Sequence, residues 1–466
     1  APQRRARSFG LFFSLGVARR NTRNACPDGA GVPQPFAQQV ISMEDFIHTL
    51  NAVIWSPALV AFCLGAGFFC SIKSRFVQLR LIPEMWRLLF QKKEDEIGLS
   101  SFQALSLTLA GRVGTGNIAG VATAICFGGP GALFWMWVVA FLGASSAFVE
   151  STLGQIYKER IEGQYRGGPA FYIERGLKLK AYAWAFAIVT ILASCFFCPG
   201  VQSNSIALAW NEAFGLDAEV TAAIVASITC FVMSVACAAL PPSRPGSCPF
   251  MAQAYIVVAL IIVGVNWEQI PDVMTLIVNS AFGFDSLTGG MLGAAIAWGV
   301  KRGIYSNEAG QGTITMPAAA ADANHPCDQG CVQAIGVFLD TIVICTLTGF
   351  VVIMGRMWTT DRGAEWFDMG KLDKFLASCG ELTGQSGAYQ IVTIFSEHLL
   401  WSVCIYLSDR LYVLYGNVRG ADFFAQGFYC SDPAAVPVRH FLWRHYQYRG
   451  NGSGRALGFK RFLPIF

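Results

Sequence analysis

SLTLAGRVGTGNIAGVATAI, residues 106–125, is apolar at both ends and rich in glycine and polar residues in its middle. Four glycines, with Arg112, Thr115 and Asn117, make the central GRVGTGNIAGV a poor helix former within a stretch that suits a bilayer. In lipid, backbone N–H and C=O groups without partners are tolerated only where they line a cavity or are buried in protein. The stretch therefore predicts a membrane helix that is interrupted at a functional site.

A second stretch of this kind, GAAIAWGVKRGIYSNEAGQGTITMPAAAA, occupies residues 293–321. N–H groups at the start of a half-helix suit a carboxylate, and the free carbonyls of an unwound turn suit Na⁺. Two interrupted helices in matching positions of two halves indicate a secondary-transporter site near the membrane midplane. Gly116 and Gly120 also form a GxxxG pattern, so close helix packing is the alternative explanation for these two glycines. The spacing fits neither a dinucleotide-binding fingerprint nor a phosphate loop.

The composition of the whole chain favours a membrane protein. Of its 466 residues, 54% are hydrophobic and 14% are charged, and the mean hydropathy of +0.45 argues against a soluble enzyme. We expect an all-α, polytopic transmembrane protein in a lipid bilayer. Its apolar spans are predicted near 49–71, 102–130, 131–156, 182–213, 219–240, 249–267, 287–318, 332–355 and 386–408.

The basic residues predict the topology. Lys and Arg cluster in 72–98 and 157–180, beside hydrophobic spans. This position predicts that both loops lie in the cytoplasm. Because the clusters flank spans, we do not expect them to bind nucleic acid. LIPEMWRLLF at 81–90 is amphipathic and is expected to lie along the cytoplasmic interface. Cys195 and Cys198 have CxxC spacing inside an apolar span without a second pair, so we interpret them as structural cysteines.

The pattern divides the chain into five parts. An Arg-rich extension, interpreted as translated upstream sequence or a targeting segment, is expected to be disordered. A peripheral first helix with the amphipathic segment comes next, followed by two helical repeats, the second of them incomplete, and an aberrant tail. In this order the parts are 1–42, 43–98, 99–270, 285–415 and 416–466.

Six ionisable residues are predicted at membrane depth, where such groups are functional candidates. They are Arg112, Glu150, Lys301, Arg302, Glu308 and Asp340. Internal ion pairing that holds the interrupted helices is the favoured interpretation, with Glu308 close to Lys301 and Arg302 as the simplest pair. A proton relay through Glu150 or Glu308 is the alternative.

Four motifs carry a family resemblance. GRVGTGNIAGVATAICFGGPGALFWMW, GQYRGGPAFYIERGL, VQSNS at 201–205 and GVKRGIYSNEAGQGT resemble the signatures of the alanine or glycine:cation symporter family over about residues 50–355. The resemblance implies eleven helices, with a ten-helix inverted-repeat core of the leucine-transporter type and two discontinuous helices. It also implies uptake of alanine or glycine across a prokaryotic plasma membrane, coupled to Na⁺ or, in some members, to H⁺, with no organic cofactor.

The resemblance also implies a substrate and cation site on the two interrupted helices. Backbone N–H groups of the first break are expected to hold the carboxylate of the amino acid. Ile304 and Tyr305 are expected to close over a small side chain and exclude larger ones by clash. The expected substrate residues are Gly114, Thr115, Gly116, Asn117, Gln202, Asn204, Ile304, Tyr305 and Asn307, and those near Na⁺ are Gly111, Gly114 and Asn117.

Parts of the chain depart from the family pattern. The family's ninth span carries a Phe-Ala-Phe-Thr-Thr-like run, whereas this chain has TIFSEHLLWSVCIYLSDRLYVLYG there. One hypothesis is a frameshift near residue 395 and another event around 241–248, which would leave an inactive remnant of a symporter. A channel without coupling and a membrane enzyme are two further hypotheses; no HExxH or GxSxG motif supports an enzyme.

Overall fold

The computed structural model describes residues 43–90, 98–161, 164–217, 219–227, 248–283, 289–356 and 371–383. The chain forms two units, Ala1–Val53 and Ile54–Phe466. In the first, the described part belongs to helix α1 (Met43–Ile54). The predictions for 1–42, 241–247, 386–408 and the tail lie outside the described residues, as does most of the span predicted at 219–240.

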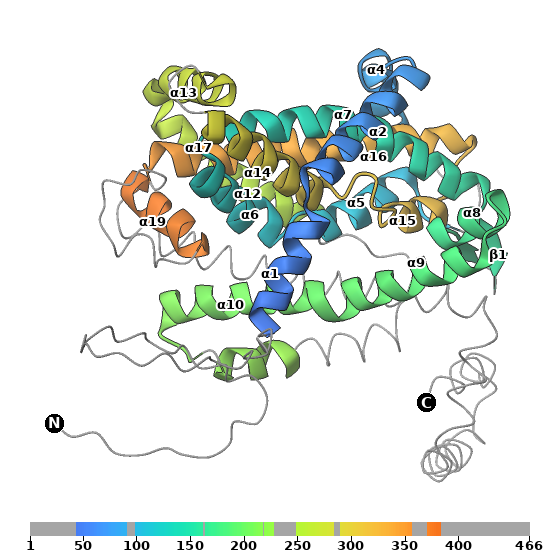
Figure 1. Ribbon diagram of the computed structural model, residues 1–466, viewed down its shortest axis with the longest axis horizontal. Coiled ribbons are helices and arrows are strands. Elements are labelled where there is room, and N and C mark those ends of the chain that lie inside the picture. The colour runs from blue at the N-terminus through green and yellow to red at the C-terminus, as the bar shows by residue number, and fades with distance from the viewer. Residues whose placement is uncertain are drawn as a thin grey trace, which may run out of the picture. The chain divides into compact units, whose positions relative to one another are not determined.

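The described part of the second unit is mostly helical (Figure 1). Its first half contains α2 (Pro57–Lys73), α3 (Val77–Arg80), α4 (Ile82–Leu89), α5 (Ser101–Arg112), α6 (Thr115–Gly128), α7 (Gly131–Ile156), α8 (Pro169–Gly176), α9 (Lys180–Leu192), η1 (Ala193–Phe197) and α10 (Cys198–Phe214). Its second half contains α12 (Cys248–Val265), η2 (Trp267–Gln269), α13 (Ile270–Phe282), α14 (Gly289–Asn307), α15 (Thr315–Ala320), α16 (Pro326–Val337), η3 (Phe338–Cys345), α17 (Thr346–Met354) and α19 (Lys371–Thr383). Strands β1 (Glu159–Ile161) and β2 (Gln164–Arg166) form a small antiparallel hairpin.

Helix α7 is the centre of the second unit. It contacts α2, α13, α14, α15 and α16, and α16 and α14 run beside it (Figure 1). Small buried residues, including Ala140, Ala144 and Ala147, line α7 where these helices approach. Small side chains allow the close approach on which membrane helix packing depends, because lipid provides no hydrophobic force between helices.

Several predicted spans are confirmed as helices. The span predicted at 131–156 coincides with α7, and all but the last residue of 332–355 falls within the continuous helical stretch Pro326–Met354. Thr49–Lys73, Gly131–Ile156 and Pro326–Met354 are long and apolar enough to cross a membrane. Tyr255–Val265 and Trp267–Phe282 would together form a fourth span, bent by 77°.

Both glycine-rich stretches separate two helices. Helix α5 starts with a capping box, in which Ser100 Oγ accepts from Gln103 N and Gln103 Oε1 accepts from Ser100 N. It ends at Arg112, because Val113 and Gly114 are extended, and α6 begins at Thr115. In the second stretch, α14 ends at Asn307 and α15 begins at Thr315.

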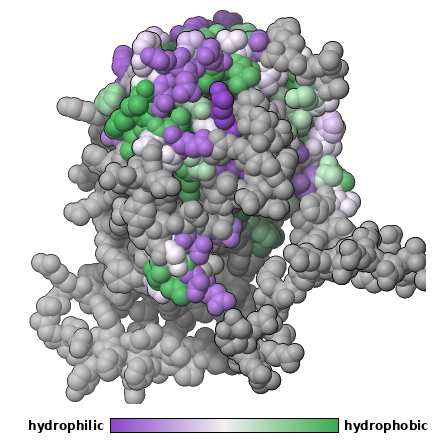
Figure 2. All heavy atoms as spheres, turned by 90° about the vertical axis from the view of Figure 1, so that its left-hand side faces the viewer, coloured by the Kyte–Doolittle hydropathy of each residue, from purple (hydrophilic) through white to green (hydrophobic). Residues whose placement is uncertain are grey.

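Some features of the fold were not anticipated. The helix predicted at 182–213 contains a π-helical segment at Ala193–Phe197, and Phe338–Cys345 is a second one within the last described span. At the end of the unit that carries α13 and α19, hydrophobic and hydrophilic side chains are intermixed on the described surface (Figure 2). There α13 exposes Met274, Val278 and Phe282, as a helix beside lipid would.

Candidate substrate and cation site

The first break lies against residues of two other helices. Gly114 is the N-cap of α6, and its Cα faces the Gln202 amide of α10: a Cβ at Gly114 would lie 3.6 Å from Gln202 Nε2. A Cβ at Gly116 would lie 3.0 Å from the ring of Tyr305 on α14. The structure therefore places Gln202 and Tyr305 beside the glycines of the break.

A buried polar cluster joins the two breaks. Asn117 Nδ2 donates to Asp340 Oδ1 at 2.6 Å, and Ser306 Oγ donates to Asp340 Oδ2 at 2.7 Å. Ser306 Oγ is also 3.2 Å from Asn117 Oδ1, and Thr341 Oγ1 donates to Asp340 Oδ2 at 3.1 Å. None of these four side chains is more than 1% exposed. We call Asn117, Ser306, Asp340 and Thr341 the Asp340 cluster.

The Asp340 cluster has the donor chemistry of a site for a hard cation. It presents carboxylate, amide and hydroxyl oxygens from the start of α6, the end of α14 and η3. Among the described residues, no group of three or more His, Cys, Asp and Glu is placed to hold a metal, so the cluster offers no soft or multi-carboxylate site. One carboxylate with neutral oxygens suits a monovalent ion.

A second buried carboxylate holds the second break. Glu150 of α7 accepts from the backbone N–H groups of Gly310 and Gly312, each at 2.9 Å. Gly310 and Gly312 have φ of +83° and +82°, which glycine adopts without a Cβ penalty. Glu308 has φ of +52° and accepts from Thr313 Oγ1. Glu150 therefore supplies the acceptors that the unwound segment needs away from water.

The buried cation of this region is Arg112, at the end of α5. Its side chain is 3% exposed, and its charge interacts with both Glu150 and Asp340. The attraction between opposite charges at this depth offsets the free-energy cost of removing both charges from water. The interpretation of the ionisable residues as internally compensated charges fits this arrangement.

The remaining predicted site residues lie at varied distances from the break. Gly111 lies in the last turn of α5, and the described features of Thr115 are those of its backbone, at the start of α6. Asn204 is exposed on α10, and Ile304 packs with Val60, Val139 and Val300. Asn307 is buried; its Oδ1 accepts from Ala309 N at 3.0 Å, and within the described part of the chain its Nδ2 has no hydrogen-bond partner.

Comparison with known proteins identifies the family. A sequence model described as the sodium:alanine symporter family matches residues 40–404. The chain belongs to this family. The match is longer than the range of about 50–355 that the motifs indicated, and it crosses both places at which a frameshift was hypothesised.

Individual relatives support the assignment to the sodium:alanine symporter family. YrbD of Bacillus subtilis (strain 168) is 53% identical over 318 residues, which are 68% of this chain and 66% of YrbD. The amino-acid carrier protein AlsT of the same strain is 42% identical over 316 residues (67% and 68%). The sodium/alanine symporter AgcS of Methanococcus maripaludis is 40% identical over 319 residues (67% and 70%). The chain thus spans about two thirds of the length of these relatives.

Membership of a family of transporters identifies the chain as a multi-pass membrane protein and not an enzyme.

In this symporter-family chain, Lys301 and Arg302 contact aromatic rings. Lys301 Nζ lies 5.4 Å from the Trp298 ring centroid and 5.8 Å from that of Trp55, and Arg302 stacks near Trp298 and Tyr305. Cation–π contacts lower the cost of placing these charges beside an apolar helix. An ion pair of Glu308 with either cation stays a prediction.

A short parallel bridge, which we call the backbone clip, pairs Leu99 with the chain just after α15. Leu99 pairs with Ala321 in a parallel bridge, with Leu99 N donating to Ala320 O at 3.0 Å and Asp322 N donating to Leu99 O at 2.8 Å. Gln155 Nε2 of α7 and Lys158 Nζ, two residues after α7 ends, donate to Ala321 O at 3.0 and 2.9 Å. Burial lowers the pKa of the Lys158 ammonium, and the charge of Asp322 opposes this shift. The clip ties the segment before α5 to the end of α15.

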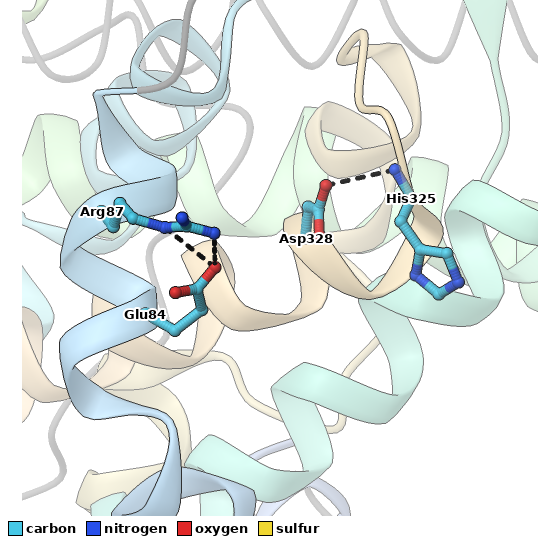
Figure 3. A network of polar contacts seen from close by, with 4 residues as sticks. All are labelled: Glu84, Arg87, His325 and Asp328. Carbon is cyan, nitrogen blue, oxygen red and sulfur yellow. Dashed lines mark hydrogen bonds and ion pairs between the residues drawn. The ribbon is translucent and has the colours of Figure 1, made fainter.

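The start of α16 is fixed by its own cap. His325 is the N-cap; its Nδ1 accepts from Cys327 N at 3.2 Å, and Asp328 Oδ2 accepts from His325 N at 3.1 Å. Figure 3 shows this cap close to the Glu84–Arg87 ion pair of α4. Helix α4 packs against α16 through its buried face.

Asp340 and Ser306, two residues of the Asp340 cluster, were not among the predicted site residues. Asp340 is recognisable in the sequence only as an ionisable residue without an obvious partner, and Ser306 lies unmarked between Tyr305 and Asn307 in one of the family motifs. One local feature could have marked Ser306 as a candidate, namely a hydroxyl group at the end of a half-helix. Its contact with a carboxylate 34 residues away has no trace in local sequence.

Proposed function

We propose that this chain is a secondary active symporter that imports alanine or glycine together with Na⁺ by alternating access. The Asp340 cluster is the observation that carries the proposal. It joins the start of α6 to the end of α14, so an ion bound there would interact with both breaks at once. In this proposal α5 with α6 and α14 with α15 are the two discontinuous helices of a leucine-transporter-type core.

The coupling ion would be held mainly by oxygen ligands of the cluster. Asp340 supplies the negative charge, and Asn117 Oδ1, Ser306 Oγ and Thr341 Oγ1 supply neutral oxygens. We also expect the backbone carbonyl oxygens of Gly111 and Gly114 to be ligands of Na⁺. Gly114 O already accepts a hydrogen bond from Asn117 N at 3.1 Å. Bound Na⁺ would supply positive charge at the break and so favour the carboxylate of the amino acid nearby.

The substrate would bind at the N-terminal end of α6. Backbone N–H groups of Gly114, Thr115 and Gly116 would hold its carboxylate, as helix N-termini hold anions. The buried Gln202 offers Oε1, which has no hydrogen-bond partner among the described residues, to the ammonium group. Tyr305 packs so closely on Gly116 that only a small substrate side chain would fit beside it. Asn204, Ile304 and Asn307 remain secondary candidates.

Proton coupling is the second candidate, because some relatives are named as sodium/proton-dependent carriers. Glu150 accepts two backbone N–H groups, so we assign it a positioning role and not a relay. The match through residue 404 makes an inactive remnant the less favoured alternative. We place the transporter in a prokaryotic plasma membrane, as its named relatives come from bacteria and an archaeon.

Uptake of labelled alanine into proteoliposomes, with and without an inward Na⁺ gradient, tests the proposal. The Asp340→Asn variant keeps the shape of the side chain and removes its charge. Losing one charge-assisted ligand should weaken the free energy of Na⁺ binding by about 1.5 to 3 kcal/mol. The Na⁺ concentration for half-maximal uptake should therefore rise about 10- to 150-fold. Asp272→Asn, on the exposed first turn of α13, is the matched control and should behave as the wild type. Uptake that ignores the Na⁺ gradient in the wild type would refute the proposed coupling.

A further inference from the structure

The chain turns sharply where α2 ends. Arg75 and Phe76, between α2 and α3, have φ of +54° and +52°, a conformation that is unusual for residues with side chains. Phe76 N donates to Ser71 O at 2.7 Å across this turn. The turn changes the direction of the chain from a span-length helix to the two short helices α3 and α4.

A buried network fixes this turn. Gln78 Nε2 of α3 donates to Ser71 Oγ of α2 at 2.9 Å, and Ser71 Oγ is 2.9 Å from Ser145 Oγ of α7. All three side chains are fully buried. Helices α3 and α4 are therefore held in a set orientation relative to α2 and α7, and their exposed face points in a defined direction.

The two faces of this segment differ in what they contact. Val77, Met85, Leu88 and Leu89 are buried and form one core cluster with residues of α7 and α16. The opposite face is exposed and carries both apolar and basic side chains. We call this face the α3–α4 surface; its residues are Ile72, Lys73, Arg75, Phe76, Leu79, Arg80, Ile82, Trp86, Arg87 and Phe90.

The composition of the α3–α4 surface suits one kind of partner. Residues 71–90 contain four cations and one carboxylate, a net charge of +3, and the carboxylate Glu84 pairs with Arg87. Trp86 and Phe90 remain 46% and 72% exposed although α4 is packed on α16. Basic clusters beside a membrane span recognise anionic lipids, and a tryptophan with apolar neighbours inserts at the level of the headgroups.

We propose that the α3–α4 surface lies in the membrane interface and binds the headgroups of anionic phospholipids. The rings and aliphatic side chains enter the boundary between headgroups and acyl chains, and Lys73, Arg75 and Arg80 neutralise the lipid phosphates. Lys73 Nζ lies 5.6 Å from the Phe69 ring centroid at the end of α2, which places this charge next to an apolar side chain. Bound lipid would hold α4, and through α4 the start of α16.

The test measures lipid-dependent thermal stability of the purified full-length chain in detergent, so it needs no transport activity. Phosphatidylglycerol and phosphatidylcholine are titrated in parallel, and the lipid concentration for half of the stabilisation is recorded. Phosphatidylglycerol should act at the lower concentration. Each cation near an anionic surface strengthens binding about fivefold, so Lys73→Gln with Arg80→Gln should raise that concentration about 25-fold.

The matched control exchanges the two residue types and keeps both charges. Lys73→Arg with Arg80→Lys should leave the phosphatidylglycerol response unchanged, because the charge of the α3–α4 surface stays the same. Should the test variant not fold, salt provides a second measurement on the wild type, because about 1 M NaCl shortens the screening length to about 3 Å and should abolish the preference. Equal responses to both lipids, or a preference that survives high salt or the double substitution, would overturn the proposal.

Discussion

Replacing Glu150 should destabilise the second break in a measurable and local way. Its carboxylate is 7% exposed and accepts from Gly310 N and Gly312 N, each at 2.9 Å. A hydrogen bond to a charged group contributes about 1.5 to 3 kcal/mol, so Glu150→Ala should lower the free energy of unfolding by about 3 to 6 kcal/mol. Glu150→Gln keeps one acceptor oxygen but turns an NH₂ group toward a backbone donor, so we expect about half of that loss.

Two measurements separate this role from a general loss of stability. Titration with sodium dodecyl sulfate in mixed micelles gives the free energy of unfolding, and hydrogen exchange reports on residues 308–314. Loss of one bond to Glu150 should speed exchange there about 10- to 150-fold, since local opening becomes easier by the same free energy. Glu84→Gln is the matched control, because Glu84 forms an exposed pair with Arg87 that is worth less than about 1 kcal/mol. If Glu150→Gln exchanged at 308–314 like the wild type, the anchoring role would be wrong.

Three further pairs of substitutions test the packing and the cap by thermal unfolding in detergent. Gly312→Ala should destabilise more than Gly310→Ala, because both have positive φ but only at Gly312 would a Cβ collide with a proline ring; equal losses would contradict this. Gly131→Ala should cost more than about 3 kcal/mol, since its Cβ would meet backbone atoms of α13, whereas Gly65→Ala, with open space around it, should be close to neutral. His325→Ala should cost about 1 kcal/mol through the lost N-cap of α16, and Asn at this position should restore most of the loss.

The positions of the helices and breaks could be predicted because their signals are local. The span at 131–156 follows from hydrophobic content alone, and it coincides with α7. The interruption after Arg112 follows from the clustered glycines, and the structure ends α5 at that residue. The N-cap His325 and the π-helical segment 338–345 were not predicted, because neither breaks the apolar pattern that marks a span.

The predicted site residues lie at varied places relative to the first break, and the sequence signals behind them differ. Gly114 and Asn117 lie on the break itself, where glycine and amide residues stand out from their apolar neighbours. Gln202 came from the family motif, and the structure places its amide beside Gly114. Asn204 came from the same motif, yet it is exposed, because two residues along a helix point to different sides.

The sequence by itself determined that this is a helical membrane protein of the sodium:alanine symporter family, and where glycine-rich segments interrupt its apolar stretches. Hydropathy, glycine content and motifs are properties of short segments, so they can be read without knowing which segments meet. Only the tertiary structure decided which partners the buried charges have. Asn117 and Asp340 are 223 residues apart in the chain, and Glu150 and Gly312 are 162 apart. Such pairs form because a buried charge needs polar partners, and packing around α7 determines which partners are within reach.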